Sequence, residues 1–178
     1  MYKTILILFS ISVLIFSCSK NSENWKIDKN DDANVVSEKL TLLFQKLLDE
    51  KNPEKEFILG NWNENKSEQH FRFLGNLKTN ENEKFGIITL KQYVGEQTKK
   101  GVSRIFVVDS LGIIGSYYIP NINDLPQKIE NEKLIFENTN NDCNQVATKI
   151  SFENGIPEKI FRKCNGNLGD IYEFQIEE

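Results

Sequence analysis

The chain has 178 residues, with 22 basic and 26 acidic side chains and a formal net charge of −4 at pH 7. This length suits one domain with a substantial hydrophobic core. The basic residues are scattered, and arginine occurs only at Arg72, Arg104 and Arg162. The chain therefore lacks the positive stripe that nucleic acid requires, and its composition argues against a nucleic-acid partner.

The first segment has the pattern of a secretory signal peptide. Lys3 is its only charge, Thr4 to Phe16 is an apolar run, and the sequence becomes polar from Ser19 onwards. The run is too short for a membrane span, which needs about 20 apolar residues. We therefore expect residues 1–17 to be a signal peptide that is removed on export.

Ile15-Phe16-Ser17-Cys18 resembles the lipobox of bacterial lipoproteins, in which a branched aliphatic residue, a variable position and a small residue precede a cysteine. The resemblance implies that the Cys18 sulfur carries a diacylglyceryl group and that the new amine is acylated, with palmitate as the expected fatty acid. The chain would then contact the membrane of the cell envelope through this anchor. Ser19 favours the outer membrane over the inner. The alternative is an ordinary signal peptide with an incidental cysteine.

Residues 18–32 are rich in Ser, Asn, Lys and Asp, so we expect the lipidated cysteine to be followed by a flexible tether. Trp25 is the aromatic exception, placed either on the domain or at the bilayer interface. A helix is predicted from about Ala33 to Glu50, ended by Pro53, with its apolar face towards a sheet or, alternatively, a partner. That face recurs with the helical period at Val36, Leu40, Leu43, Phe44, Leu47 and Leu48.

Short β-rich runs separated by turn residues follow Pro53. They predict an α+β fold that is mostly β, in a single domain over residues 33–178. The expected architecture is an antiparallel meander, curved sheet or barrel of about 8–9 strands with the N-terminal amphipathic helix packed on it. The candidate strands are Phe57–Trp62, Gln69–Leu74, Phe85–Tyr93, Val102–Val108, Ile113–Ile119, Leu134–Glu137, Gln145–Phe152, Ile156–Arg162 and Ile171–Ile176.

Two hairpins are predicted from their turns. Asp109-Ser110-Leu111-Gly112 combines a turn-starting aspartate with a glycine between two apolar runs. Glu153-Asn154-Gly155 fits a three-residue loop with glycine in the left-handed position. The second loop pairs Thr148 with Ile160. It puts one apolar set on a common face: Val146, Ile150, Phe152, Ile156 and Ile160.

Two cysteines remain once Cys18 is assigned to the lipobox, and an even remainder in an exported chain predicts a disulfide between Cys143 and Cys164. Its closed loop of about 22 residues would contribute roughly 3 kcal/mol. Strict alternation sends the two side chains to opposite faces, so the bridge requires a bulge or an irregular strand end. Two free buried thiols are the alternative.

His70 is the only histidine, and it lies on the polar side of a strand whose other side has Phe71 and Phe73. A metal site needs three or four converging ligands, so we interpret His70 as an ordinary surface residue. Glu130 and Glu132 are interpreted as a solvated edge or turn. The sequence has no hydrolase nucleophile pattern and no phosphate-binding glycine loop. It therefore predicts no catalytic residue, no metal ligand and no cofactor.

Gly60-Asn61-Trp62 resembles the Gly-x-Trp opening of lipocalin-like barrels, in which the tryptophan closes one end of the barrel. The resemblance implies a barrel with room for one small apolar ligand, and it makes Trp62 a candidate pocket or sheet-closing residue. The alternative is a tryptophan that packs the sheet against the helix.

These patterns favour a non-enzymatic envelope protein that binds something or supports an assembly. An envelope protein partner predicts a filled interior and an exposed aromatic patch, whereas a small apolar ligand predicts an apolar cavity. Tyr93, Tyr117 and Tyr118 are the first candidates for such a patch, with burial in the core as the alternative. An envelope hydrolase is the third hypothesis, and it requires convergent polar residues with perturbed pKa values in a cleft.

Overall fold

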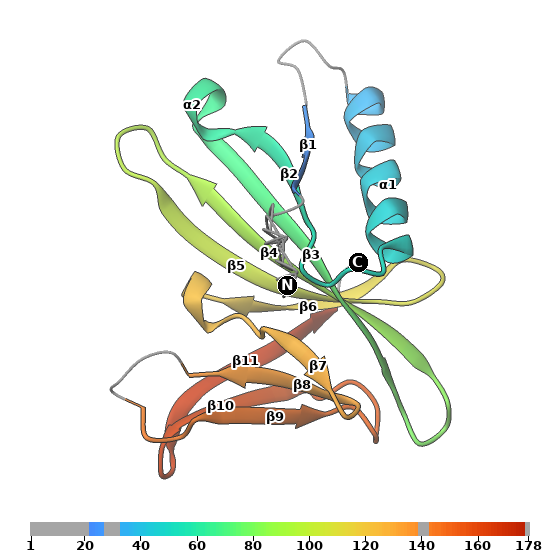
Figure 1. The fold of residues 1–178 in the computed structure, drawn as a ribbon, viewed down its shortest axis with the longest axis vertical. Coiled ribbons are helices and arrows are strands. Elements are labelled where there is room, and N and C mark those ends of the chain that lie inside the picture. The colour runs from blue at the N-terminus through green and yellow to red at the C-terminus, as the bar shows by residue number, and fades with distance from the viewer. Residues whose placement is uncertain (1–21, 27–32, 139–142, 177–178) are drawn as a thin grey trace, which may run out of the picture.

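The computed structural model describes residues 22–26, 33–138 and 143–176, most of them in β-strands (Figure 1). One sheet has eight strands and a second sheet has three. In spatial order the large sheet contains β1 (Ser22–Trp25), β2 (Glu56–Asn61), β3 (Ser67–Lys78), β4 (Lys84–Val94), β5 (Lys100–Val108), β6 (Ile113–Ile119), β11 (Leu168–Ile176) and β10 (Lys159–Asn165). The small sheet contains β7 (Lys128–Glu130), β8 (Lys133–Glu137) and β9 (Ala147–Ser151).

The prediction of a mostly β fold with antiparallel strands is confirmed, but the barrel is not found. Strands β2 to β6 pair in sequence order as an antiparallel meander. The order of the large sheet is linear, and within the described residues no pairing joins β1 to β10. The sheet stays open because the chain leaves it after β6, builds the small sheet, and returns to its edge with β10 and β11.

The hairpin between β5 and β6 has the predicted turn. The Asp109 carboxylate accepts hydrogen bonds from the backbone N–H groups of Leu111 and Gly112, at 2.7 and 3.1 Å. The backbone N–H of Asp109 donates to the Gly112 carbonyl at 2.9 Å. Gly112 has φ +140°, a conformation that favours glycine because it lacks a Cβ.

One face of the large sheet packs against α1 (Ala33–Asp49). Leu43 and Leu47 of the helix are fully buried in a cluster with strand residues such as Phe57. Phe44 places its ring edge-on to Phe71 and Phe106, with centroids 5.8 and 6.4 Å apart. Full burial of each such side chain contributes about 1.5–3 kcal/mol, so this cluster holds the helix on the sheet.

The opposite face of the large sheet packs against the small sheet, which lies in the lower half of Figure 1 at the level of β10 and β11. Strand β5 contributes to both cores because its run Ile105–Val108 is continuously apolar. Ile105 and Val107 enter this second cluster, and Phe106 and Val108 enter the helix-side cluster. The second cluster is filled by fully buried side chains, including Tyr117, Phe136, Phe152 and Ile160.

The prediction of a flexible tether over residues 18–32 is wrong at Ser22–Trp25. These residues form strand β1, which pairs in parallel with β2. Neighbouring elements supply the stabilisation that its polar composition lacks. Glu23 forms ion pairs with Lys46 and Lys55, at 2.8 and 3.1 Å, and Trp25 packs against the helix-side cluster. Trp25 is therefore docked on the domain.

The predicted pairing at Glu153–Gly155 is wrong, although Gly155 has the expected positive φ of +101°. Strand β9 pairs with β8, and β10 pairs with β11, so Thr148 lies opposite Phe136 rather than Ile160. The physical reason is that a turn motif fixes the local bend but not the partner strand, and β8 and β11 are the edges that this fold presents to β9 and β10. Four members of the predicted apolar face still enter the second cluster, while Val146 is 82% exposed.

Cys143 and Cys164 form the predicted disulfide. The alternation expected for a β9–β10 hairpin does not apply, but the register of β10 with β11 does shift between Lys163 and Asn165. This shift falls at Cys164, and Cys143 lies in an irregular segment before β9. The backbone N–H of Gln145 also donates to the Cys164 carbonyl at 2.9 Å.

Candidate functional site

Charged side chains gather on one part of the large sheet, on the face opposite α1. Alternation along β3 sends Phe71 and Phe73 to the helix-side cluster and His70 and Arg72 to the other face. The register places His70 beside Lys91 of β4. The small sheet covers the lower part of this face (Figure 1), and the side chains of His70, Arg72 and Lys91 beyond it are only partly buried.

A cleft of about 240 Å³ lies over these charged residues, and we call it the His70 cleft. Its floor comes from β2, β3 and β4, and its wall comes from the segment that connects β6 to β7, including the short 3-10 helix η1 (Ile122–Asp124). The lining residues are Glu56, His70, Arg72, Thr89, Lys91, Ile122, Asn123, Leu125, Pro126 and Gln127.

Hydrogen bonds fix the wall of the His70 cleft, most of them through Gln127. Its backbone N–H donates to the Ile135 carbonyl at 2.9 Å, and its side-chain carbonyl accepts from the Glu137 N–H at 2.6 Å. Its backbone carbonyl accepts from Arg72 Nη2 at 2.9 Å, which ties the wall to the floor. Asp124 adds an ion pair with buried Arg162 of β10, at 3.0 Å. The cleft is therefore preformed.

His70 contacts two carboxylates, one from each side of its ring. Nε2 lies 2.7 Å from Glu68 Oε1, and Nδ1 lies 3.3 Å from Glu56 Oε2. The side chain is only 18% exposed, so the interpretation of His70 as an ordinary surface residue is wrong. The predicted position of His70 on the polar face of its strand is correct. Glu68 indicates the contact in the sequence, because residues i and i+2 of a strand share a face.

The carboxylates raise the pKa of His70 above its ordinary value, with the hydrogen bond to Glu56 as the largest cause and burial opposing it. The same hydrogen bond lowers the pKa of Glu56 to about 2, again against burial, and the charges of Lys91 and Arg72 lower it further. An opposite charge within a few ångströms favours the ionised form of both partners. An ionised carboxylate accepts hydrogen bonds and donates none, so contacts at both ring nitrogens favour the imidazolium form of His70.

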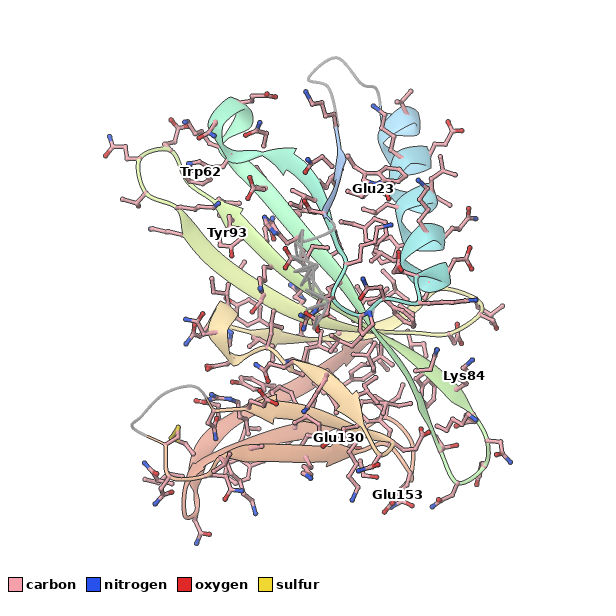
Figure 2. All side chains as sticks on the ribbon, in the orientation of Figure 1. Glu23, Trp62, Lys84, Tyr93, Glu130 and Glu153 are labelled. Carbon is pink, nitrogen blue, oxygen red and sulfur yellow. A yellow bond between two sulfur atoms is a disulfide. The ribbon has the colours of Figure 1, made fainter. Side chains whose placement is uncertain are left out.

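Aromatic side chains lie beside this ion-pair group at the end of the sheet remote from the small sheet (Figure 2). Tyr93 meets the His70 ring edge-on, with centroids 5.4 Å apart. Lys99 Nζ lies 4.2 Å from the Tyr93 ring centroid, 5.7 Å from that of Trp62 and 3.2 Å from Glu68 Oε1. Trp62 begins the short helix α2 (Trp62–Asn65), and it is not among the residues that line the cleft.

The other residues singled out in the sequence lie apart from the cleft. Tyr117 is fully buried and its hydroxyl donates to the Pro157 carbonyl, whereas Tyr118 is 41% exposed on the helix-side face. Glu130 and Glu132 belong to the hairpin between β7 and β8, as the turn interpretation predicts. Asn131 and Glu132 both have positive φ, at 51° and 56°, which is the geometry of a tight two-residue hairpin turn.

Cys18 lies outside the described residues. Within the described ranges, no group of three or more His, Cys, Asp or Glu side chains is arranged to hold a metal ion. No helix in the same part of the chain has the length and apolar character to cross a membrane. Comparison with protein-family models, with curated proteins and with solved structures finds no match to this chain.

Proposed function

We propose that this chain is a lipid-anchored protein of the bacterial cell envelope whose β-rich domain binds a ligand in the His70 cleft without catalysing a reaction. The observation that supports binding over catalysis is the arrangement around His70, where each ring nitrogen meets a carboxylate oxygen. A general base needs a free lone pair directed at the proton that it accepts. An imidazolium held between two carboxylates has two N–H donors and no such lone pair.

The lipid anchor is proposed from the lipobox resemblance at Ile15–Cys18, and the position of β1 fits it. Only residues 19–21 separate Cys18 from the start of β1. An extended chain spans at most about 3.6 Å per residue, so Ser22 lies within about 14 Å of Cys18. The anchor would therefore hold the domain close to the lipid headgroups, and Ser19 favours the outer membrane for this location.

A polar ligand is better supported than the small apolar ligand of a barrel. Both hydrophobic clusters are filled by side chains, and the aromatic members Phe57, Phe136 and Phe152 are at most 1% exposed. The His70 cleft is lined instead by charged and amide side chains. An envelope protein partner is the second candidate, favoured by the exposure of Leu168 and Ile171, at 72% and 61%, on the β10–β11 hairpin.

The anchor is tested by the mass of the chain isolated from native membranes. We expect a terminus at Cys18 carrying diacylglyceryl and fatty acyl groups, and recovery of the chain in the outer-membrane fraction. The Cys18→Ala variant should lose both properties because it has no thiol to modify. An intact Met1, or a trimmed terminus without lipid, would contradict the proposal.

The non-catalytic assignment is tested by the protonation of His70, whose Hε1 resonance is unique because the chain has one histidine. We expect its NMR titration to give a pKa above the ordinary value of 6.5, in line with the two carboxylates at its ring. The Glu56→Gln variant should lower that pKa. A ring that is neutral below pH 6 in the wild-type chain would instead fit a base and overturn the assignment.

A further inference from the structure

Two cationic side chains of the His70 cleft, Arg72 and Lys91, have few partners among the described residues. A guanidinium has five N–H donors, and the hydrogen bond found for Arg72 in the described part of the chain is the one from Nη2 to Gln127. Lys91 Nζ lies 3.8 Å from Glu56 Oε1, which is beyond hydrogen-bond distance. Most donors of both side chains therefore remain available to a molecule in the cleft.

The charge of the cleft is positive, although the chain as a whole is acidic. Two permanent cations, Arg72 and Lys91, line it beside His70, against a single carboxylate, Glu56. Glu68 also contacts His70, but it is matched by its own ion pair with Lys99 at 3.2 Å. A cleft with low-dielectric walls concentrates such a field, so it attracts an anion even on a negatively charged protein.

The strand register sets the spacing of the two cations. His70 is paired with Lys91 and Arg72 is paired with Thr89, so Arg72 and Lys91 are diagonal neighbours on one face of β3 and β4. Diagonal neighbours are about 7–8 Å apart, within reach of long side chains. The two head groups can therefore converge on one anionic group, and the fixed wall at Gln127 reduces the ordering cost of binding.

The size of the cleft limits what it holds. A water molecule takes about 30 Å³ in the liquid, so a volume of about 240 Å³ corresponds to about eight waters. Pockets for drug-sized ligands are larger, at about 300–1,000 Å³ and mostly apolar. The cleft therefore fits a small polar molecule, or the polar head of a larger one, rather than an acyl chain.

We propose that the His70 cleft binds an oxyanion, the phosphate or carboxylate group of a small polar ligand, between the Arg72 guanidinium and the Lys91 ammonium. This inference rests on the proposed binding function and names its ligand class. Guanidinium and ammonium groups are the usual protein partners of phosphate and carboxylate oxygens. The oxyanion can belong to a soluble metabolite or to a lipid headgroup, because Ser22, close to the proposed anchor, is paired with Glu56 of the cleft.

The test is a titration of the full chain, purified in neutral detergent, with inorganic phosphate and with acetate. Calorimetry gives the Kd, and the His70 Hε1 resonance reports binding inside the cleft. We expect Arg72→Gln and Lys91→Gln each to weaken binding by about tenfold or more, because each removes a charge-assisted contact. Glu56→Gln should tighten binding by roughly threefold, because it removes the carboxylate that repels the anion.

Arg104→Gln is the matched control. It removes the same charge from the same sheet, but Arg104 lies on the helix-side face, where it donates to Ser116 and packs on Tyr118. We expect it to leave the Kd unchanged. Near-UV circular dichroism verifies that each variant is folded, and Arg72→Lys, which keeps the charge, should retain more affinity than Arg72→Gln.

The source of the oxyanion is distinguished by repeating the phosphate titration in nanodiscs. If the ligand is a lipid headgroup, anionic phosphatidylglycerol nanodiscs should weaken phosphate binding by competition, whereas phosphatidylcholine nanodiscs should not. If it is soluble, the two discs should give the same Kd. Phosphate and acetate that fail to bind, or that bind wild type, Arg72→Gln and Arg104→Gln equally, overturn the ligand class. The anchor and the non-catalytic assignment are unaffected by that failure, because mass and His70 titration test them separately.

Discussion

Replacing Glu56 by glutamine should lower the stability of the fold by an amount that depends on pH. The pKa of Glu56 falls from 4.5 to about 2 on folding, mainly through the hydrogen bond with His70. Each pKa unit corresponds to about 1.4 kcal/mol, which gives at most about 3 kcal/mol for the ionised carboxylate. Its side chain is 27% exposed, so solvent screening reduces the expected contribution to about 2 kcal/mol.

The direction of the effect follows from the two pKa shifts. The pKa of Glu56 is lowered, so its contribution is complete above about pH 4.5 and is lost as the pH falls towards 2. The pKa of His70 is raised, so its contribution is complete below about pH 6.5 and is lost as the pH rises through the folded value. The ion pair therefore stabilises the fold most strongly between about pH 4.5 and 6.5.

Urea unfolding of the full chain, followed by circular dichroism from pH 3 to pH 8, measures this dependence. The wild type should exceed Glu56→Gln by about 2 kcal/mol near pH 5.5, and the difference should shrink towards pH 3. Glu173→Gln is the control, because Glu173 and Lys159 form an exposed ion pair at 2.7 Å, and we expect no measurable change from it. Parallel curves for wild type and Glu56→Gln below pH 5 would refute the reasoning.

Three further predictions concern the fold. Replacing Cys143 and Cys164 together by alanine should lower the unfolding free energy by about 3 kcal/mol in urea titration, because the loop of the unfolded chain is no longer closed. Gly115→Ala should destabilise β6 by more than about 1 kcal/mol, because the new Cβ would meet the backbone carbonyl of Gln175 on β11. Trp25→Ala should increase hydrogen exchange of β1 selectively, because it removes the side chain that docks this strand on the helix-side cluster.

The features that the sequence predicts well depend on residues close together in the chain. The Asp109–Gly112 turn is specified by an aspartate and a glycine three positions apart, and its hydrogen bonds are those that such residues make. The run Ile105–Val108 is apolar at every position, and both faces of β5 are indeed buried. In both cases the physical cause lies within a few residues, so periodicity and turn chemistry suffice.

Partner choice between strands is the part that sequence patterns do not determine. The loop at Glu153–Gly155 is compatible with a β9–β10 hairpin, yet β9 pairs with β8 and β10 pairs with β11. Strand β1 is a similar case, because its polar composition predicts disorder and its stability comes from β2, Lys46 and Lys55. Backbone pairing is nearly independent of side-chain identity, so the outcome depends on which edges the rest of the fold leaves available.

The His70 cleft contains contacts of both kinds, some within one strand and some between distant segments. Only the contacts within one strand can be predicted from the sequence. Glu68 and His70 share a strand, so their contact follows from alternation alone. Glu56 reaches His70 through strand pairing, and Gln127 meets Arg72 from 55 residues away, after the chain has left the large sheet. When the partner of a cation lies that far along the chain, the neighbouring residues in the sequence give no sign of it. Such a cation is then interpreted as an ordinary surface charge. The positive cleft arises because the segment Ile122–Gln127 crosses Arg72 and Lys91 without bringing a carboxylate to their side of the wall, since its one acidic residue, Asp124, pairs with Arg162 instead.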